Sequence, residues 1–372
     1  MRLVEKQTYD KYRYVSEQLR EFISLTKEPQ ASMLRRSLDD LDYGASKILF
    51  MGRLKSGKST LINSIIGDFQ MSVKDIPFTT TTAITTVEMG VDTDNVEVFY
   101  TSKKMSLEQF TKEQELIIME GICDRFANVD HVEMHSQNEL FENGVKLIDS
   151  PGLEEANSRT KTTYEYVPKA NAIIFTLNAT SLFTMLEKNY IAEHFAGKHM
   201  HNLFFVVNRI DGLHKGELET NVKPQVREGL RDVFTDENGK FDEDLYNRRV
   251  FFIAAYPALC AKMNKPYTVR VGNKDVTVPF PLEETGLPEF EAALKEFLNS
   301  DERLYCSLLK MAQAYNAENA SNRTTKLAEM SNILGNCYTI IFGYASTDEI
   351  IRQLCEIADG SIDEKFKRDS FS

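Results

Sequence analysis

The amino-acid sequence predicts an α/β fold in which helices cover both faces of a mostly parallel sheet, with a helical bundle added beside it. Short apolar runs alternate with amphipathic segments from about residue 44 to residue 300, and this alternation is typical of a parallel sheet with crossover helices. A glycine-rich segment links the first of these runs to the first amphipathic segment. Apolar residues at helical spacing near both ends of the chain predict the bundle.

The strands are predicted from short runs rich in β-branched and aromatic residues, which suit strands buried on both faces. The five clearest runs are residues 47–51, 145–148, 172–177, 203–207 and 250–254. Further strand candidates are residues 83–89, 96–101 and 131–134. One helix is expected at residues 106–126, before the last of these strands.

Two turn signals add detail to this sheet. Asn143-Gly144 is a dipeptide that favours a two-residue hairpin turn, so we expect a hairpin that leads into Val145. Gly272-Asn273 separates two runs that alternate valine with polar residues. We therefore expect a second hairpin within residues 264–284, as an insertion at the rim of the sheet.

We expect three segments along the chain. Residues 1–43 have apolar positions at helical spacing, interrupted at Pro29, and are predicted to be the N-terminal helices of the bundle. Residues 44–300 form the α/β domain, and residues 301–372 return to helical spacing. The two sets of terminal helices are predicted to pack together, because neither has another partner for its apolar face.

Composition and charge argue against several classes of protein. The formal net charge is −12 and no long basic stretch offsets it, so we expect no binding to nucleic acid. The five cysteines are odd in number and form no C-x-x-C pair, which predicts reduced thiols in a cytoplasmic protein rather than a disulfide framework or a zinc site. The most apolar stretch near the C-terminus, residues 337–345, is too short to cross a bilayer.

The glycine-rich segment is predicted to be a phosphate-binding loop. Residues 52–59 follow the pattern G-x-x-x-x-G-K-S between a strand and a helix, where backbone N–H groups and the helix N-terminus converge on an anion. Lys58 adds a positive charge near the β- and γ-phosphates, and Ser59 offers a hydroxyl to Mg²⁺. The nucleotide-binding residues predicted here are Gly52, Lys55, Ser56, Gly57, Lys58, Ser59 and Thr60.

Two further segments are expected to complete the phosphate end of the site. Asp149-Ser150-Pro151-Gly152 follows a predicted strand. The carboxylate of Asp149 can hold Mg²⁺ through a water molecule, and the N–H of Gly152 can meet the γ-phosphate. A run of threonines lies between the first helix and the second strand, and we expect Thr81, with Thr82 as second choice, to close over the γ-phosphate and Mg²⁺.

The base is predicted to be guanine. Asn208-Arg209-Ile210-Asp211 follows a buried strand and has the form N-[KR]-x-D. The carboxylate of Asp211 can accept hydrogen bonds from N1–H and N2–H₂ of guanine, whereas adenine offers no such pair of donors. Asn208 is expected to tie this loop to the phosphate loop, and the stem of Arg209 can lie along the base. The backbone N–H of Ala255, after another strand, is a candidate donor to guanine O6.

Together these segments resemble the GTPase domain of the dynamin superfamily, and most of all bacterial dynamin-like proteins and mitofusins. The likeness covers residues 44–298 and includes the phosphate loop, Thr81-Thr82-Ala83-Ile84, Asp149 to Leu153, residues 170–175, the base loop and residues 285–290. Most GTPases carry Lys at the position of Arg209, whereas mitofusins carry Arg there, as this chain does. The resemblance implies binding of GTP and GDP with Mg²⁺, hydrolysis of GTP, a homodimer formed through the GTPase domains, and action on a membrane lipid surface.

Three positions depart from related families. Leu54 stands where conventional dynamins carry a catalytic Gln, and Leu153 stands where Ras-like proteins carry a water-orienting Gln. Lys55 occupies the place of a charge-stabilising Arg in guanylate-binding proteins, so we hypothesise that it acts once two domains meet. The catalytic residues implied by the resemblance are Lys55, Lys58, Ser59 and Thr81. The membrane-binding paddle of the family is not visible, so we expect a truncated chain or one half of a two-chain system.

The leading hypothesis is a cytoplasmic GTPase, peripheral on a membrane, that remodels or fuses membranes. Its turnover would move the helices of residues 1–43 and 302–372 relative to the sheet. An alternative, favoured by the two leucines, is a slow GTP-dependent switch or scaffold that recruits a protein partner. An ATPase or kinase of phosphate-loop type would require Asn208 and Asp211 to be accidental.

Overall fold

We describe the fold from a computed structural model of the whole chain. The structure describes residues 1–10, 13, 46–68, 84–91, 95–99, 103–106, 131–153, 166–167, 170–197, 201–236, 239–271, 274–300 and 303. Several predictions lie outside these residues. They are the switch threonines Thr81 and Thr82, nearly all of the helix predicted at 106–126, the turn Gly272-Asn273 and most of the terminal helices.

The chain divides into two compact units. The first is Met1–Val4 with Ser46–Leu298, and the second is Glu5–Ala45 with Asn299–Ser372. In the second unit, the backbone N–H of Glu5 donates to Oδ1 of Asn299 at 2.9 Å. Segments from the two ends of the chain therefore meet in that unit. The sheet and the predicted site belong to the first.

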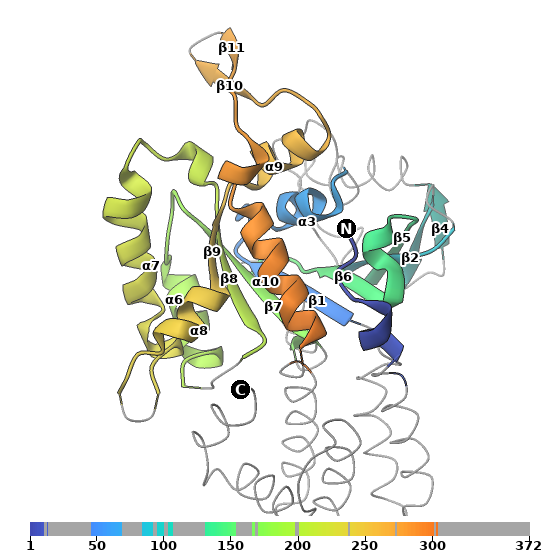
Figure 1. Cartoon of the computed structure of the whole chain (residues 1–372), viewed down its shortest axis with the longest axis horizontal. Coiled ribbons are helices and arrows are strands. Elements are labelled where there is room, and N and C mark those ends of the chain that lie inside the picture. Colours follow the sequence, from blue (N-terminus) through green and yellow to red (C-terminus); the bar gives the residue numbers. More distant parts are fainter. Residues whose placement is uncertain are drawn as a thin grey trace, which may run out of the picture. The chain divides into compact units, whose positions relative to one another are not determined.

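The described part of the first unit is built on a nine-stranded sheet in the order β4-β3-β5-β2-β6-β1-β7-β8-β9 (Figure 1). The strands are β1 Ser46–Gly52, β2 Ile84–Met89, β3 Asn95–Phe99, β4 Lys103–Ser106, β5 His131–Ser136, β6 Val145–Asp149, β7 Ala172–Asn178, β8 Leu203–Asn208 and β9 Val250–Ile253. Pairing is antiparallel for β4–β3, β3–β5 and β2–β6 and parallel for the other neighbours. The predicted mostly parallel sheet is confirmed, and the five clearest predicted strands are β1, β6, β7, β8 and β9.

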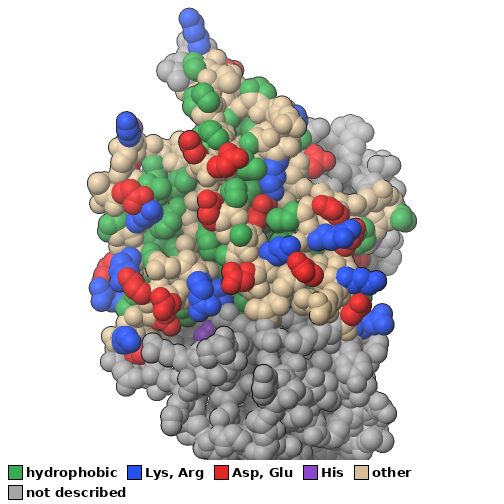
Figure 2. Space-filling view, in the orientation of Figure 1, with side chains coloured by type: hydrophobic (Ala, Val, Ile, Leu, Met, Phe, Trp, Pro, Cys, Tyr) green, Lys and Arg blue, Asp and Glu red, His purple; other side chains and the backbone are tan. Residues whose placement is uncertain are grey.

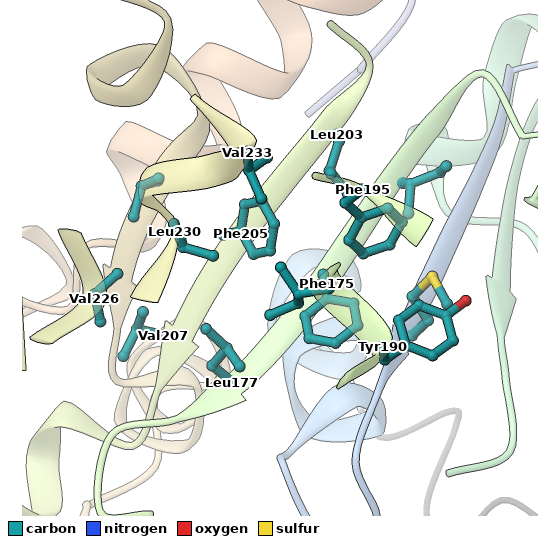
Figure 3. Close-up of a cluster of buried hydrophobic side chains, with 14 of the residues drawn as sticks. Phe175, Leu177, Tyr190, Phe195, Leu203, Phe205, Val207, Val226, Leu230 and Val233 are labelled. Atoms are coloured by element: carbon teal, nitrogen blue, oxygen red, sulfur yellow. The ribbon is translucent and has the colours of Figure 1, made fainter. Parts of the chain in front are cut away.

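Helices cover both faces of this sheet. Successive side chains of a strand point to opposite faces, so two neighbouring residues of β8 show what packs on each face. On β8, Phe205 packs against Phe234 and, with Phe175 of β7, belongs to the buried cluster drawn in Figure 3. The neighbouring ring on the strand, Phe204, packs instead against Phe290 and Phe297 of helix α10, Leu287–Asn299. Helices α6 Met185–His194, α7 Lys223–Gly229 and α8 Glu243–Arg249 contribute to the cluster of Phe205. The other helices are α3 Lys58–Ile66, α9 Ala255–Lys262 and α10 Leu287–Asn299.

Local sequence signals set the ends of these helices. Helix α6 begins with a capping box, in which Thr184 and Glu187 each bond the backbone of the other. Helix α3 ends at Gly67, which has φ 83° and donates its N–H to the carbonyl of Asn63, as glycine does at many helix C-termini. Short 3₁₀ turns are η3 Glu139–Gly144, η5 Ile210–Gly212, η7 Arg231–Val233 and η8 Leu282–Glu284, and a π turn, η6 Leu218–Val222, precedes α7.

The hairpin predicted at Asn143-Gly144 is wrong. Both residues do have the positive φ of a tight turn, 60° and 77°. However, β5 and β6 on either side of this turn are not neighbours in the sheet, because β2 lies between them. The dipeptide ends η3 and directs the chain into β6. A local turn signal fixes the backbone conformation, but it does not fix which strands pair.

The second predicted hairpin is present. Strands β10 Thr268–Val271 and β11 Lys274–Thr277 form a separate antiparallel pair. Figure 1 shows this pair projecting from the end of the unit where α9 lies. On the described part of the face drawn in Figure 2, acidic and basic side chains are interspersed.

Candidate nucleotide-binding site

The predicted motifs meet at one edge of the sheet. Strands β1, β6 and β8 belong to the parallel part of the sheet. The phosphate loop, the Asp149 segment and the base loop follow their carboxyl ends. Loops after neighbouring parallel strands lie together, and ligands of such sheets bind outside these strand ends.

The phosphate loop depends on two glycines. Gly52 has φ 144°, and a Cβ there would lie 2.4 Å from the carbonyl oxygen of Thr176 on β7. Gly57 has φ 94°, and a Cβ there would lie 2.3 Å from Nδ2 of Asn208. No other residue type satisfies both the dihedral angle and the close approach. The loop is therefore fitted tightly against β7 and the base loop.

Lys58 lies inside the phosphate loop. Its side chain is buried, and its ammonium donates to the carbonyls of Gly52 at 3.2 Å and Arg53 at 3.1 Å. Helix α3 begins at the same residue, so the positive end of the helix and the ammonium reinforce one another. Ser56 is buried as well, and its Oγ has no hydrogen-bond partner among the described residues. These features make a site for an anion.

Ser59 and Asp149 come together beside this loop. The hydroxyl of Ser59 donates to Oδ2 of Asp149 at 2.6 Å. Asp149 is fully buried, and it is held at the end of β6 in register with Phe50 of β1. A hydroxyl and a carboxylate are oxygen donors of the kind that Mg²⁺ prefers. Among the described residues no group of three or more His, Cys, Asp or Glu side chains could hold a metal ion.

The segment after Asp149 contacts the phosphate loop directly. The N–H of Leu153 donates to the carbonyl of Gly52 at 3.3 Å. A Cβ on Gly152 would lie 2.8 Å from the backbone nitrogen of Leu54. Glycine is thus required at position 152 for the two loops to approach so closely. Leu153 is only 7% exposed and belongs to the main buried cluster.

Asn208 connects the base loop to the phosphate loop. Its Nδ2 donates to the carbonyls of Ser56 at 3.4 Å and Gly57 at 3.3 Å. Its Oδ1 accepts from the N–H of Arg209 at 2.7 Å and of Ala255 at 3.1 Å. The contact predicted between the two loops is therefore present. Both ends of this buried amide are used, which fixes the position of the base loop.

Asp211 lies at the outer end of the base loop. Arg209 has φ 69° and turns the chain into η5, which contains Asp211. Oδ2 of Asp211 accepts a hydrogen bond from the hydroxyl of Tyr267 at 2.9 Å. Burial, and next the negative charge of Asp211, raise the pKa of this tyrosine well above its ordinary value. The phenol therefore keeps its proton at neutral pH and acts as a donor.

Most predicted site residues with a described position are thus brought together around the two loops. Lys55 is exposed at the tip of the phosphate loop with φ 61°, and Thr60 is half-buried in the first turn of α3. Ala255 is fully buried, and its N–H donates to Oδ1 of Asn208. The contact of this N–H with guanine O6 stays a prediction. Thr81 lies outside the described residues.

Two contacts at the site were not predicted from the sequence. Tyr267 reaches Asp211 from 56 positions further along the chain, in a segment predicted only as a rim insertion. The guanidinium of Arg53 donates to Oγ of Ser181 in the loop after β7 at 3.4 Å. No sequence motif marks either contact. The only signal near Tyr267 is the alternation of valines in the hairpin that follows it.

The fold and these loops define a nucleotide-binding domain of the phosphate-loop GTPase class. A family model described as "Dynamin family" matches residues 48–210. The chain is 23% identical over 299 residues to "Bacterial dynamin-like protein" of Nostoc punctiforme, covering 72% of this chain and 40% of that protein. It is 23% identical over 258 residues to "Mitofusin-2" of Rattus norvegicus, covering 68% of this chain and 33% of that protein. Residues 48–210 of the chain thus match the dynamin family, and the chain spans less than half the length of these two relatives.

The fold likeness extends to solved structures. One is described as "An oligomerised bacterial dynamin pair provides a mechanism for the long range sensing and tethering of membranes". It matches with a TM-score of 0.51 and 17% identity, over 95% of this chain and 62% of that one. Within the residues described here, no helix combines the length and apolarity needed to cross a membrane.

Proposed function

We propose that this chain binds GTP between the phosphate loop and the base loop and hydrolyses it to GDP and phosphate. The observation that carries the proposal is the double role of Asn208. The same side chain holds the loop expected to grip the phosphates and the loop that presents Asp211. One buried amide therefore sets the distance between a phosphate subsite and a base subsite.

Guanine is favoured by the chemistry of Asp211. A carboxylate only accepts hydrogen bonds, and the N1–H and N2–H₂ edge of guanine supplies two donors. Adenine presents an acceptor at N1, which would leave the carboxylate facing a lone pair. Arg209, exposed at the turn into η5, is proposed to lie along the base through its aliphatic stem.

The phosphates are proposed to bind to the N–H groups of residues 52–60, with Lys58 neutralising the β- and γ-phosphates. The donor set of Ser59 and Asp149 fits Mg²⁺, with Ser59 as a direct ligand and Asp149 acting through water. Mg²⁺ would supply charge neutralisation at the phosphates when it is bound. The polar groups that would hold it are already side by side at 2.6 Å. Thr81 is proposed as a further ligand from the first switch.

Hydrolysis requires a water oxygen to form a bond with the γ-phosphorus while the bond to the β–γ bridging oxygen breaks. The chain's own contribution is positioning and charge, from Lys58 and from the N–H of Gly152. Lys55, exposed at the tip of the phosphate loop, is proposed to add a second positive charge when two nucleotide faces meet in a homodimer. Such a dimer would make turnover depend on protein concentration.

We propose that turnover moves the terminal helices, residues 1–43 and 301–372, relative to the GTPase domain of residues 44–300. The dynamin-like and mitofusin relatives, and the tethering described for the bacterial dynamin pair, support membrane remodelling or fusion as the use of that movement. The five cysteines, odd in number and without a C-x-x-C pair, support a cytoplasmic protein. The dynamin-like relatives support a peripheral place on a lipid surface.

A second candidate function is a slow GTP-dependent switch that recruits a protein partner. Leu153 favours it, because the side chain at the position expected to orient water is buried in the hydrophobic cluster. An apolar side chain offers no hydrogen bond to an attacking water, so hydrolysis by an isolated domain should be slow.

Turnover of the full chain at rising protein concentration separates the two functions. For the dynamin-like enzyme, we expect phosphate release per molecule to rise with concentration, and Lys55→Ala to abolish the rise. A flat and very slow rate would favour the switch. Competition of ADP and GDP for a fluorescent guanine nucleotide tests the shared premise: equal affinity for both would overturn each function.

A further inference from the structure

The root of the β10–β11 hairpin contacts the base loop through one hydrogen bond, and two further hydrogen bonds fix the root itself. The hydroxyl of Tyr267, just before β10, donates to Asp211 at 2.9 Å. The N–H of Val278, just after β11, donates to the carbonyl of Tyr267 at 2.9 Å, which closes the hairpin at its root. The N–H of Lys265 donates to the carbonyl of Cys260 at 2.8 Å, which ties the same segment to α9.

The ring of Tyr267 is braced from two sides. Tyr256, in the first turn of α9, packs edge-on against it with ring centroids 6.0 Å apart. Phe280, in the segment between β11 and α10, packs edge-on from another element at 5.9 Å. Aromatic pairs at such separations restrict the rings that form them. The hydroxyl of Tyr267 is therefore held at a defined place relative to Asp211.

We propose that Tyr267 is a positioning residue for guanine recognition, and that the hairpin root is a wall of the base pocket that fixes the carboxylate of Asp211. This inference rests on the proposed function. Each carboxylate oxygen has two lone pairs, so Oδ2 can accept from the phenol and from the base together. A carboxylate already held in one rotamer loses less freedom when it accepts two donors from guanine.

The geometry also predicts which nucleotides depend on this contact for their affinity. Guanine makes two hydrogen bonds to Asp211, and this requires the carboxylate plane to lie in the plane of the base. Hypoxanthine, the base of IDP, lacks the 2-amino group and makes one, which tolerates more rotation. Loss of the phenol hydroxyl should therefore weaken the binding of GDP more than that of IDP, and it should leave the binding of ADP unchanged.

The test is titration calorimetry of GDP, IDP and ADP on the full 372-residue chain and on Tyr267→Phe, which keeps the ring and removes the hydroxyl. We expect GDP affinity to fall about tenfold and the GDP to IDP preference to fall several-fold. In an Asp211→Ala background, Tyr267→Phe should have no further effect, because the phenol acts through that carboxylate. Tyr246→Phe, on α8 before β9, is the matched control and should change none of these affinities.

The outcomes are distinct. Suppose that the unaltered chain binds GDP. If Tyr267→Phe lowers the affinities for GDP, IDP and ADP by the same factor, or lowers none of them, the positioning role is overturned and the proposed function stands. If the unaltered chain binds no guanine nucleotide, both fall. A thermal melt of each variant shows whether it is folded. Should Tyr267→Phe prove unfolded, Phe280→Leu, which loosens the brace without touching the hydroxyl, must lower the GDP to IDP preference or the inference fails.

Discussion

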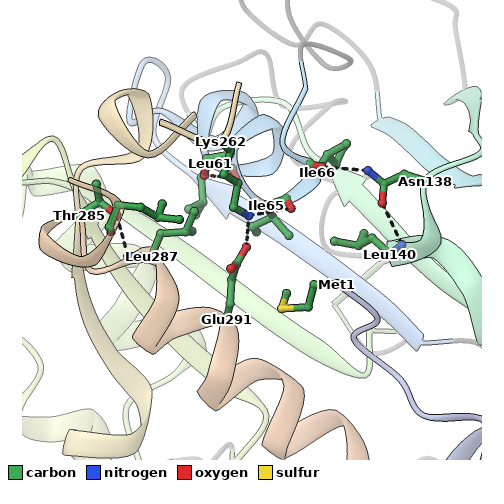
Figure 4. A network of polar contacts seen from close by, with 12 residues as sticks. Met1, Leu61, Ile65, Ile66, Asn138, Leu140, Lys262, Thr285, Leu287 and Glu291 are labelled. Atoms are coloured by element: carbon green, nitrogen blue, oxygen red, sulfur yellow. Dashed lines mark hydrogen bonds and ion pairs between the residues drawn. The ribbon is translucent and has the colours of Figure 1, made fainter. Parts of the chain in front are cut away.

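Lys262 of α9 forms an ion pair with Glu291 of α10, and the same ammonium donates to the carbonyl of Ile65 in α3 at 3.2 Å (Figure 4). One side chain thus joins the helix of the phosphate loop, the helix that follows the base-side strand β9, and the last helix of the unit. Burial raises the pKa of Glu291, and the charge of Lys262 opposes that rise. The pair is mostly buried, so neither partner is expected to be replaceable alone.

Lys262→Met should destabilise the first unit by about 3 kcal/mol at pH 7.5, because it leaves a buried carboxylate without its cation. The pKa of Glu291 in the folded state would then rise further above its unfolded value. A raised carboxyl pKa contributes stability at low pH that is lost as pH rises through the folded pKa. The deficit relative to the unaltered chain should therefore shrink at pH 5. Urea melts at the two pH values check this, with exposed Lys240→Met as a control that should change stability by less than about 0.5 kcal/mol.

Asn208→Ala should reduce both stability and nucleotide affinity. The change leaves the carbonyls of Ser56 and Gly57 and the N–H of Ala255 without their partner in a buried place, which costs about 2–4 kcal/mol. It also frees the base loop from the phosphate loop, so GDP binding should fall by at least about a hundredfold.

A matched control for this change is Asn171→Ala. Asn171 is also buried, and its Oδ1 accepts from the backbone N–H of Lys47 at 2.8 Å. That contact lies at the opposite end of β1 from the phosphate loop. Calorimetry with GDP should show near-normal affinity for Asn171→Ala despite a lowered melting temperature. Equal losses of affinity in both variants would mean that Asn208 acts only through stability.

The sequence predicted those parts of the fold and site that depend on local chemistry. The phosphate loop is defined by backbone dihedrals and one lysine, so Gly52, Gly57 and Lys58 could be identified from spacing alone. Asp149 and Asn208 follow apolar strands, and parallel strands bring their ends to one edge of the sheet. The contact between Asn208 and the phosphate loop therefore followed from topology.

Tertiary contacts account for what the sequence did not reveal. Asn143-Gly144 has the predicted dihedrals, but the insertion of β2 between β5 and β6 depends on how the whole sheet is ordered. The approach of Tyr267 to Asp211 depends on where a rim insertion folds back. The close contact of Gly152 with Leu54 likewise involves two loops whose separation no pattern records.

Gly152→Ala should impair hydrolysis more than binding of GDP. The added Cβ would lie 2.8 Å from the backbone nitrogen of Leu54, so the loop after Asp149 must move away from the phosphate loop. GDP has no γ-phosphate and does not depend on the N–H of residue 152. We expect GTP turnover to fall by about tenfold or more, which corresponds to about 1.4 kcal/mol of barrier, while GDP affinity changes less than threefold by calorimetry.

Gly197→Ala is the control for this glycine. Gly197 also has a positive φ, 68°, but nothing lies within 4 Å of the place where its Cβ would be. It should therefore lose about 1 kcal/mol of stability from backbone strain and keep full turnover. A Gly152→Ala variant that behaves in the same way would show that the close contact with Leu54 has no part in hydrolysis.

Leu153→Gln should not create a faster GTPase, although it restores the residue type that orients water in Ras-like proteins. Leu153 is 7% exposed and lies in the buried cluster with Leu49 and Met51. A glutamine there either buries an unsatisfied amide or pulls out of the cluster and leaves a gap. We expect a loss of about 2–3 kcal/mol of stability in a urea melt and no increase in phosphate release. An increase would mean that the side chain at 153 can reach the γ-phosphate, and the buried position of Leu153 would then no longer support the proposed slow switch.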